Sequence, residues 1–316
     1  FDHFLDVRDR SDEAVARLSR ELGIDIAVDL KGFTQDTRFG IFSYRCAPVQ
    51  VSYLGYPGTT GADYIDYAIA DKVVLPPQAR CHFSEKVVYL PHSYQVNDSK
   101  RRIADRAFTR EALGLPATGF VFCCFNNNYK ILPQMLDGWG RILHAVEDSV
   151  LWLLEDNPAV SRNLLREAQA RGIAPQRLVF AQRMPLDEHL ARHRLADLFL
   201  DTLPCNAHTT ASDALWAGLP VLTCAGQSFA SRVAASLLHA VGLPELVTET
   251  QGAYEARAIA LARDAGQLDA LRSRLHAQAP ASPLFDARRF ARDLEAAYVV
   301  MHARAVQGLP PEAFKV

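Results

Sequence analysis

The stretch from Asp201 to Gly218 holds the residues best suited to bind a phosphate. It begins at the end of an apolar run typical of a buried strand, and a helix is predicted to begin at Thr209 or Thr210. Such a helix directs free backbone N–H groups and its positive dipole end at the carboxyl edge of the strand. Thr210 and Asp213 have the spacing of a capping box, and His208 adds a further donor. The pattern indicates either a seat for a diphosphate or a well-capped helix in an ordinary α/β domain.

Lys130 is the second candidate for phosphate chemistry. It lies in FNNNYK, directly after the apolar run 121–126, where a compact ammonium could neutralise a departing diphosphate. A lysine that extends from a loop into solvent would give the same pattern. His189 and His193 are four residues apart on a predicted helix, but no third ligand has a usual metal spacing. Since the chain also lacks a D-x-D pair, we predict no metal site.

Motifs of several other enzyme classes are absent from the sequence. Gly55, Gly58 and Gly61 do not have the G-x-G-x-x-G spacing of dinucleotide-binding folds. The chain also lacks a Walker A pattern and the G-x-S-x-G elbow of α/β hydrolases. The glycine-rich GYPGTTG is therefore open to interpretation as a simple turn.

Composition bounds the class of protein. The chain has 316 residues, a net charge of −2 and 49% hydrophobic residues, as in an ordinary globular protein of about two domains. The near-neutral charge predicts neither nucleic acid nor a membrane as partner, and no apolar run approaches the ~18 residues of a spanning helix. Six cysteines without C-x-x-C pairs indicate free thiols, and we expect a cytoplasmic protein. The chain begins with Phe1 and has no signal peptide, so we expect an excerpt of a longer protein.

The second half of the chain has a regular pattern of apolar strands and helices. Strands are predicted at 121–126, 149–156, 177–182, 198–202 and 220–226. Helices are predicted between and after them, at 132–146, 161–172, 187–194, 209–217 and 229–241. This alternation indicates a parallel sheet covered on both faces, with ligands beyond the carboxyl ends of its strands.

The remaining segments are less regular. A helix is predicted at 12–22, and strands at 24–30, 49–55, 67–71 and 86–91. Residues 97–119 are polar and indicate a linker, whose basic run we interpret as a solvated face: Lys100, Arg101, Arg102, Arg106 and Arg110. The tail predicts a final amphipathic helix.

Several stretches together resemble the O-GlcNAc transferase family, including its bacterial homologues. They are VSYLGYPGTTGADYIDY, FNNNYKILP, SVLWLLED, DEHLARHRLADLFLDTLPCNAHTTASDALWAGLPV, FASRVAASLL and SPLF. The resemblance implies an α/β fold of GT-B type, with two Rossmann-like lobes built on parallel sheets and the first lobe incomplete in this chain. It implies four parts: the remainder of the N-terminal catalytic lobe at 1–100, a linker at 101–118, the C-terminal nucleotide-binding lobe at 119–283, and a C-terminal helix at 284–316 that packs back across the lobes.

The resemblance also implies an activity. It is an inverting, metal-independent transfer of GlcNAc from UDP-GlcNAc to Ser or Thr hydroxyls of a protein or peptide acceptor, with no cofactor. Within the same fold, GDP-fucose or UDP-glucose could be the donor, or the chain could be a nucleotide-sugar epimerase, which acts on free sugar. A protein that binds a nucleotide-sugar without transferring it is the alternative from another class. The TPR repeats that recruit acceptors in the family have no counterpart here, because no 34-residue period occurs, and we expect them upstream.

The family's phosphate-binding residues have counterparts in this sequence. Lys130 matches the lysine on the diphosphate, and His208, Thr209 and Thr210 match the phosphate loop. The resemblance makes Lys130 and His208 the candidates for catalysis. Asp213 matches the carboxylate that holds the ribose hydroxyls, a role that competes with helix capping.

The remaining implied contacts concern the base and the sugar. His189 matches the histidine packed on uracil, Arg192 lies on the same helix face, and Met184 is where a backbone group reads the base edge. Leu186 stands where the family has a lysine, so one ribose or phosphate contact differs. The other implied binding residues are Asn127, where the family often has Gln, and the first-lobe loop that approaches the sugar, which consists of Leu54, Gly55, Tyr56 and Pro57.

Overall fold

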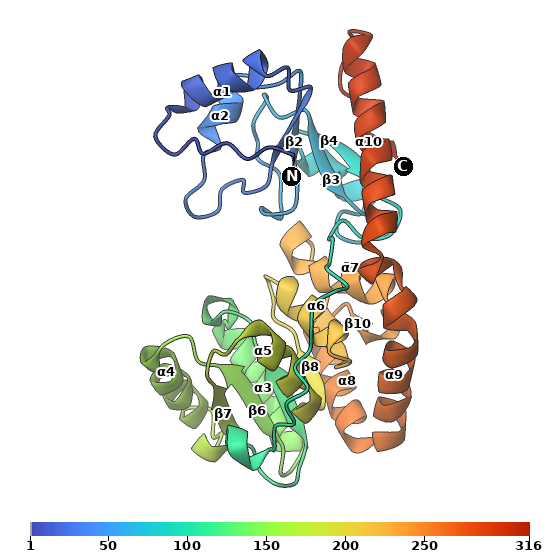
Figure 1. The fold of residues 1–316 in the computed structure, drawn as a ribbon. Coiled ribbons are helices and arrows are strands. Elements are labelled where there is room, and N and C mark those ends of the chain that lie inside the picture. The colour runs from blue at the N-terminus through green and yellow to red at the C-terminus, as the bar shows by residue number, and fades with distance from the viewer. Residues whose placement is uncertain (1) are drawn as a thin grey trace. The chain divides into compact units, whose positions relative to one another are not determined.

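A computed structural model describes residues 2–316 of the protein (Figure 1). The chain forms two compact units. The first unit comprises Phe1–Gln95 and Arg288–Val316, and the second comprises Val96–Ala287. The lobe boundaries expected at residues 100, 118 and 283, and the incompleteness of the first lobe, stay predictions.

The first unit is built on a parallel sheet with the strand order β1-β2-β3-β4-β11. Its strands are β1 (Ile26–Asp29), β2 (Val49–Ser52), β3 (Tyr67–Ala70), β4 (Lys86–Tyr89) and β11 (Phe314–Lys315). Its helices are α1 (Asp12–Glu21), α2 (Gly40–Ser43) and α10 (Ala287–Val306). Ser11 caps α1 by accepting a hydrogen bond from Ala14 N at 3.2 Å, and two acidic residues in the first turn favour the positive helix end. The four strands predicted here exist, although β1 and β2 are shorter than expected.

The segment predicted as the end of a strand at 53–55 is a tight turn. Leu54 has a φ of 72°, in the left-handed region, so β2 ends before it. A Cβ on Gly55 would stand 2.0 Å from the carbonyl oxygen of Leu30, and only glycine fits there. The turn therefore needs this glycine to bring the loop close to the end of β1.

The second unit carries a six-stranded parallel sheet with the order β10-β9-β8-β5-β6-β7. Its strands are β5 (Val121–Cys124), β6 (Val150–Leu154), β7 (Leu178–Ala181), β8 (Leu198–Leu200), β9 (Val221–Cys224) and β10 (Val247–Thr248). Its helices are α3 (Pro133–Ala145), α4 (Pro158–Gln169), α5 (Leu186–Arg192), α6 (Thr209–Trp216), α7 (Val233–Ala240), α8 (Gln251–Arg263) and α9 (Ala265–Gln278). The five strands and five helices predicted for residues 121–241 are confirmed.

Helices α8 and α9 and strand β10 complete this unit beyond the predicted pattern. Helix α3 packs against α8, and α6 packs against both α5 and α7. A buried chain of hydrogen bonds joins three of these elements: Trp139 Nε1 donates to the Tyr254 hydroxyl at 3.2 Å, which donates to the carbonyl of Asp201 at 3.0 Å. The carboxyl end of β8 is thereby fixed to α3 and α8.

Candidate functional site

The loops that follow β5 and β8 meet because these strands are neighbours in the sheet. Asn126, after β5, is 1% exposed and donates to Asp201 Oδ1 at 3.3 Å and to Thr202 Oγ1 at 2.8 Å. Its amide oxygen accepts a short hydrogen bond from the hydroxyl of Thr210 on α6. A buried amide with all its contacts fixed holds the two loops and the start of α6 in one arrangement.

Asp201 organises the loop between β8 and α6. Its carboxylate accepts hydrogen bonds from Ala207 N at 2.6 Å, Thr202 N at 2.7 Å and Thr223 Oγ1 at 2.6 Å. Burial raises the pKa of Asp201 to about 6, although these hydrogen bonds and the charge of Lys130 act in the opposite direction. The side chain is therefore mostly ionised at pH 7 and fixes the backbone that leads into α6.

Lys130, which follows β5, reaches across to this loop. Its Nζ donates to the carbonyl of Asn206 at 2.6 Å, two residues before His208. The half-buried ammonium thus lies beside the start of α6, where the first backbone N–H groups have no partner inside the helix. One positive charge and one positive helix end therefore converge on the same place.

His208 precedes α6 and carries no charge at pH 7. Burial, followed by the neighbouring charge of Lys130, lowers its pKa to about 4. Its Nε2 lies 3.4 Å from the carbonyl oxygen of Ala230. The ring can therefore exchange hydrogen bonds with a ligand at neutral pH but adds no charge.

The predicted capping box at the start of α6 is wrong. The helix begins at Thr209, which makes His208 the N-cap residue, and no side-chain hydrogen bond caps it; Thr210 lies inside the first turn, where its hydroxyl donates to Asn126. The Asp213 carboxylate is bound instead by Arg101, through a short hydrogen bond from Nη1 to Oδ1. Neither half of the expected box is thus available to the helix backbone.

A cavity of about 330 Å³ opens beside these loops in the second unit. Six of the predicted site residues line it: Asn127, Met184, His189, Arg192, Thr210 and Asp213. They come from four separate segments, which follow β5 and β7 or belong to α5 and α6. Leu186, where the family has a lysine, lines the same cavity.

The α5 side of the cavity combines aromatic rings with a buried guanidinium. The ring centroids of His189 and Phe125 are 5.3 Å apart, and Arg192 lies 4.6 Å above the ring of Phe125. Burial, with the neighbouring His193 and Arg192, lowers the pKa of His189 to about 2, so the ring is neutral. Arg192 donates to the carbonyl of Gln182 at 2.6 Å, and burial lowers its pKa to about 10, which leaves it charged at pH 7. A flat neutral ring beside a cation suits a planar heterocycle.

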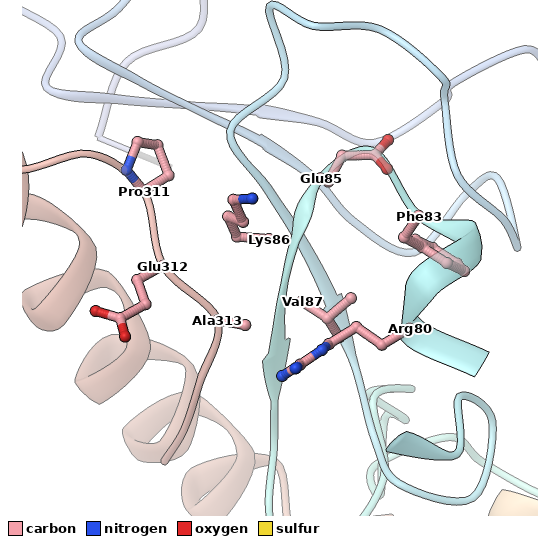
Figure 2. A pocket seen from close by; sticks show the side chains of 8 residues that line it. All are labelled: Arg80, Phe83, Glu85, Lys86, Val87, Pro311, Glu312 and Ala313. Atoms are coloured by element: carbon pink, nitrogen blue, oxygen red, sulfur yellow. The ribbon is translucent and has the colours of Figure 1, made fainter. Parts of the chain in front are cut away.

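The remaining predicted residues lie in the first unit. Leu54, Gly55, Tyr56 and Pro57 form the tight turn after β2. A different cavity of this unit, of about 410 Å³, lies between β4 and the segment before β11 and contains none of them (Figure 2). Its carboxylate Glu85 is already bound by Thr59 and Thr60, at 2.6 Å and 2.5 Å from their hydroxyls.

Sequence reasoning missed Asn126, Asp201 and Arg101 as parts of the site. The first two are polar residues at the carboxyl ends of apolar strands, a position that marks ligand loops in parallel sheets. The basic run at 97–119 was interpreted as a solvated face, which is wrong for Arg101 because its side chain is only 13% exposed. Arg102, at 75%, fits the interpretation.

The described residues contain neither a cluster of metal ligands nor a membrane-spanning helix. Among residues 2–316, no group of three or more His, Cys, Asp or Glu side chains is placed to hold a metal ion. In the same part of the chain, no helix has the length and apolar character needed to cross a bilayer. All six cysteines are free thiols, as predicted.

Comparison with known proteins decides the family. Residues 1–108 and 106–294 match Glycosyl transferase family 41. The chain belongs to this family. It is 41% identical over its whole length to a protein of Arabidopsis thaliana named "Probable UDP-N-acetylglucosamine--peptide N-acetylglucosaminyltransferase SEC". It is also 36% identical over 97% of its length to the tomato (Solanum lycopersicum) protein of the same activity name, SPINDLY.

A solved structure gives the same family relationship in three dimensions. An O-GlcNAc transferase mutant from Thermobaculum terrenum superposes with a TM-score of 0.85 and 35% identity, over 96% of this chain and 57% of that one. The predicted α/β fold of GT-B type, with a parallel sheet in each of two Rossmann-like units, is confirmed. The chain spans about a third of the length of the curated relatives, 33% for both plant proteins.

Proposed function

We propose that this family 41 chain is the catalytic region of a protein O-GlcNAc transferase, with UDP-GlcNAc as donor and a Ser or Thr hydroxyl of a protein as acceptor. The observation that carries the proposal is that Lys130 lies beside the start of α6, whose first turns line a cavity together with aromatic side chains. The names of its relatives support UDP-N-acetylglucosamine as the donor and a peptide as the acceptor, and the Ser or Thr hydroxyl follows from the resemblance to the family. The whole protein would contain this chain as a part.

The site residues have distinct roles in this proposal. His189 and the backbone at Met184 bind the base, Asp213 binds the ribose, and the Thr209 hydroxyl and the first backbone N–H groups of α6, that of Thr210 included, bind the diphosphate. Arg192 stays behind the base, since burial against Phe125 keeps it in place. His208, neutral at pH 7, exchanges a hydrogen bond with the phosphates.

The chemistry breaks the bond between the sugar's anomeric carbon and the diphosphate oxygen. An acceptor hydroxyl oxygen attacks that carbon from the opposite face, inverts it and releases its proton, while the electron pair of the broken bond stays on UDP. The interaction between the Lys130 ammonium and the leaving diphosphate then becomes stronger, because negative charge accumulates on the diphosphate as the bond breaks. A preorganised charge of this kind lowers the barrier without tightening ground-state binding equally.

A titration of the full-length protein tests the nucleotide specificity. Calorimetry should show tighter binding of UDP than of GDP, because in this proposal His189 packs on uracil, and EDTA should leave the affinity unchanged. Equal affinity for GDP, or loss of UDP binding with the chelator, would contradict the uridine-specific, metal-independent proposal.

A further inference from the structure

Arg101 joins the segment at the start of the second unit to the wall of the candidate site. It lies in the extended stretch that follows Val96, which runs beside α6 in Figure 1. Its Nη1 donates to Asp213 Oδ1, and the two side chains are only 13% and 8% exposed. Asp213 lines the cavity of about 330 Å³, whereas Arg101 stands behind it.

The segment that carries Arg101 is held against α6 by contacts of its own. Trp216 Nε1 donates to the carbonyl of Arg101 at 3.1 Å, and the hydroxyl of Ser212 donates to Asn97 Oδ1 through a short bond. Ser212 and Trp216 are four residues apart and so share one face of the helix. The backbone on both sides of the ion pair is thereby fixed, and the guanidinium has little freedom to leave the carboxylate.

The ion pair with Arg101 engages one carboxylate oxygen of Asp213 and leaves the second oxygen without a hydrogen bond among the described residues. In residues 2–316, the Asp213 side chain makes no hydrogen bond except the one to Arg101. The other nitrogens of Arg101 do not bind Asp213. Nε donates to the carbonyl of Asp98 at 3.2 Å, and Nη2 is buried without a partner in the described part of the chain. Asp213 therefore presents a charged oxygen with unused acceptor capacity on the wall of the cavity.

A buried carboxylate keeps its charge only with a partner, because loss of hydration favours the neutral form. Burial raises the pKa of Asp213, and the charge of Arg101 opposes that rise. An ionised carboxylate accepts hydrogen bonds from hydroxyl groups more strongly than a neutral acid does. Arg101 thus supplies both the charge state and the orientation that acceptance of hydroxyl protons requires.

We infer that Arg101 is a positioning residue for the nucleotide's ribose: through its ion pair it orients Asp213 so that the free carboxylate oxygen accepts hydrogen bonds from the ribose hydroxyls. The inference rests on the proposed function, because it needs a ribonucleotide in the cavity. It assigns to the segment that begins the second unit a part in substrate recognition, and it distinguishes Arg101 from its exposed neighbour Arg102, which pairs with the still more exposed Asp105.

The test compares UDP with 2′,3′-dideoxy-UDP, which lacks both ribose hydroxyls, by calorimetry on the full-length protein. The parent should prefer UDP by about tenfold or more, the usual effect of hydrogen bonds to a charged group. Arg101→Gln should bind UDP more weakly and reduce the preference to less than about threefold, while binding of the dideoxy analogue changes little. Arg101→Lys, which keeps one charged donor, should recover part of the preference.

Two controls separate this role from a structural one. Arg102→Gln removes a neighbouring exposed arginine and should retain the full preference. Asp213→Asn should lose the preference by itself, and adding Arg101→Gln should cause little further loss, since the two residues act as one unit. If Arg101→Gln is too unstable to titrate, Arg101→Lys and Asp213→Asn carry the comparison.

The outcomes are distinguishable from failure of the proposed function. A parent that binds UDP more tightly than GDP but shows no ribose preference would overturn the role of Arg101 alone. So would a folded Arg101→Gln variant that keeps the preference in full. A parent that does not bind UDP, or binds GDP as well, would overturn the proposed function and this inference with it.

Discussion

Lys130 is the residue on which the chemical proposal depends most. Lys130→Ala in the full-length protein should fold normally and keep most of its UDP binding, because α6 and its threonines still hold the phosphates. Sugar transfer should fall by roughly a hundredfold or more, which corresponds to ~3 kcal/mol of lost transition-state stabilisation. Single-turnover transfer from labelled UDP-GlcNAc, measured beside a UDP titration of the same variant, gives both numbers.

Two further variants make the Lys130 experiment decisive. Lys130→Arg should not restore full activity, because a planar fork cannot replace a compact ammonium bound to the Asn206 carbonyl. Lys100→Ala removes an exposed lysine of the same unit and should leave transfer unchanged. If Lys130→Ala transfers sugar within a factor of about three of the parent, Lys130 has no part in the reaction.

Asp201 should matter for stability and for binding, although it does not line the cavity. In Asp201→Asn the remaining carbonyl oxygen can serve Thr202 and Ala207, which both donate to Oδ1, but the amide nitrogen replaces Oδ2, the acceptor of the Thr223 hydroxyl, and the negative charge near Lys130 is lost. A buried group left without a partner costs about 2 kcal/mol, so the free energy of unfolding should fall by that amount and UDP affinity should weaken. Chemical unfolding and calorimetry measure the two effects.

Asp269 provides the matched control for that substitution. Its side chain is 73% exposed and lies on α9, so Asp269→Asn should change neither quantity. An Asp201→Asn variant as stable as the parent, with unchanged UDP affinity, would show that the carboxylate does not organise the loop before α6.

At the scale of elements, α5 and the turn that follows it carry two histidines, His189 and His193, that make stability depend on pH. Burial lowers the pKa of His193 from its usual value of 6.5 to about 4. Between these values the unfolded chain binds a proton that the folded one does not, so stability is lost as pH falls. The pKa values of His189 and His208 are also lowered, so these residues too reduce stability as pH falls. Asp201 acts in the opposite direction: its pKa is raised to about 6, so its protonation stabilises the folded protein as pH falls below that value.

The variant His193→Gln isolates one of these groups. One histidine accounts for about 1.4 kcal/mol per pH unit, so between pH 6.5 and about pH 5 the parent should lose about 2 kcal/mol more than the variant. Urea unfolding at both pH values measures the difference, and the exposed His276→Gln should behave as the parent does. Equal losses in parent and His193→Gln would show that His193 is not held neutral.

The elements themselves were predictable where short, continuous apolar runs alternate regularly with segments of helical pattern. Residues 121–241 follow this rule, and each strand and helix there was placed within a few residues. Helices α8 and α9 lie outside the predicted pattern, although the buried residues of α9, Leu268, Leu271 and Leu275, have helical spacing. The strand predicted to 55 ends earlier because Leu54 adopts a left-handed conformation, which periodicity cannot reveal.

The site was predictable in part, for a related reason. Strand ends and the family resemblance pointed to Lys130, which contacts the loop before α6, and to six residues that line the cavity of about 330 Å³. Contacts between segments that are distant in the sequence could not be predicted. Arg101 and Asp213 are 112 residues apart in the chain, and only the fold brings them together. The capping-box spacing of Thr210 and Asp213 therefore does not produce a capping box, because the buried guanidinium of Arg101 binds the Asp213 carboxylate.

At the scale of the whole molecule, the two units should respond differently to ligands. Hydrogen exchange of the full-length protein should show that UDP protects the second-unit segments around Lys130, His189 and His208. The prediction that Leu54 to Pro57 contact the sugar implies that UDP-GlcNAc, but not UDP, also protects that first-unit loop. Protection of the loop by UDP alone, or by neither ligand, would contradict a contact with the sugar.

The central claim is that this family 41 chain transfers GlcNAc from UDP-GlcNAc to a protein hydroxyl. A donor competition tests it most directly: the full-length protein receives one acceptor protein together with equal concentrations of UDP-GlcNAc, UDP-glucose and GDP-fucose. Mass spectrometry then identifies the sugar and the residue that carries it. We predict N-acetylhexosamine on Ser or Thr, and its loss in Lys130→Ala; attachment of a hexose or a deoxyhexose, or an acceptor that stays unmodified, would contradict the account.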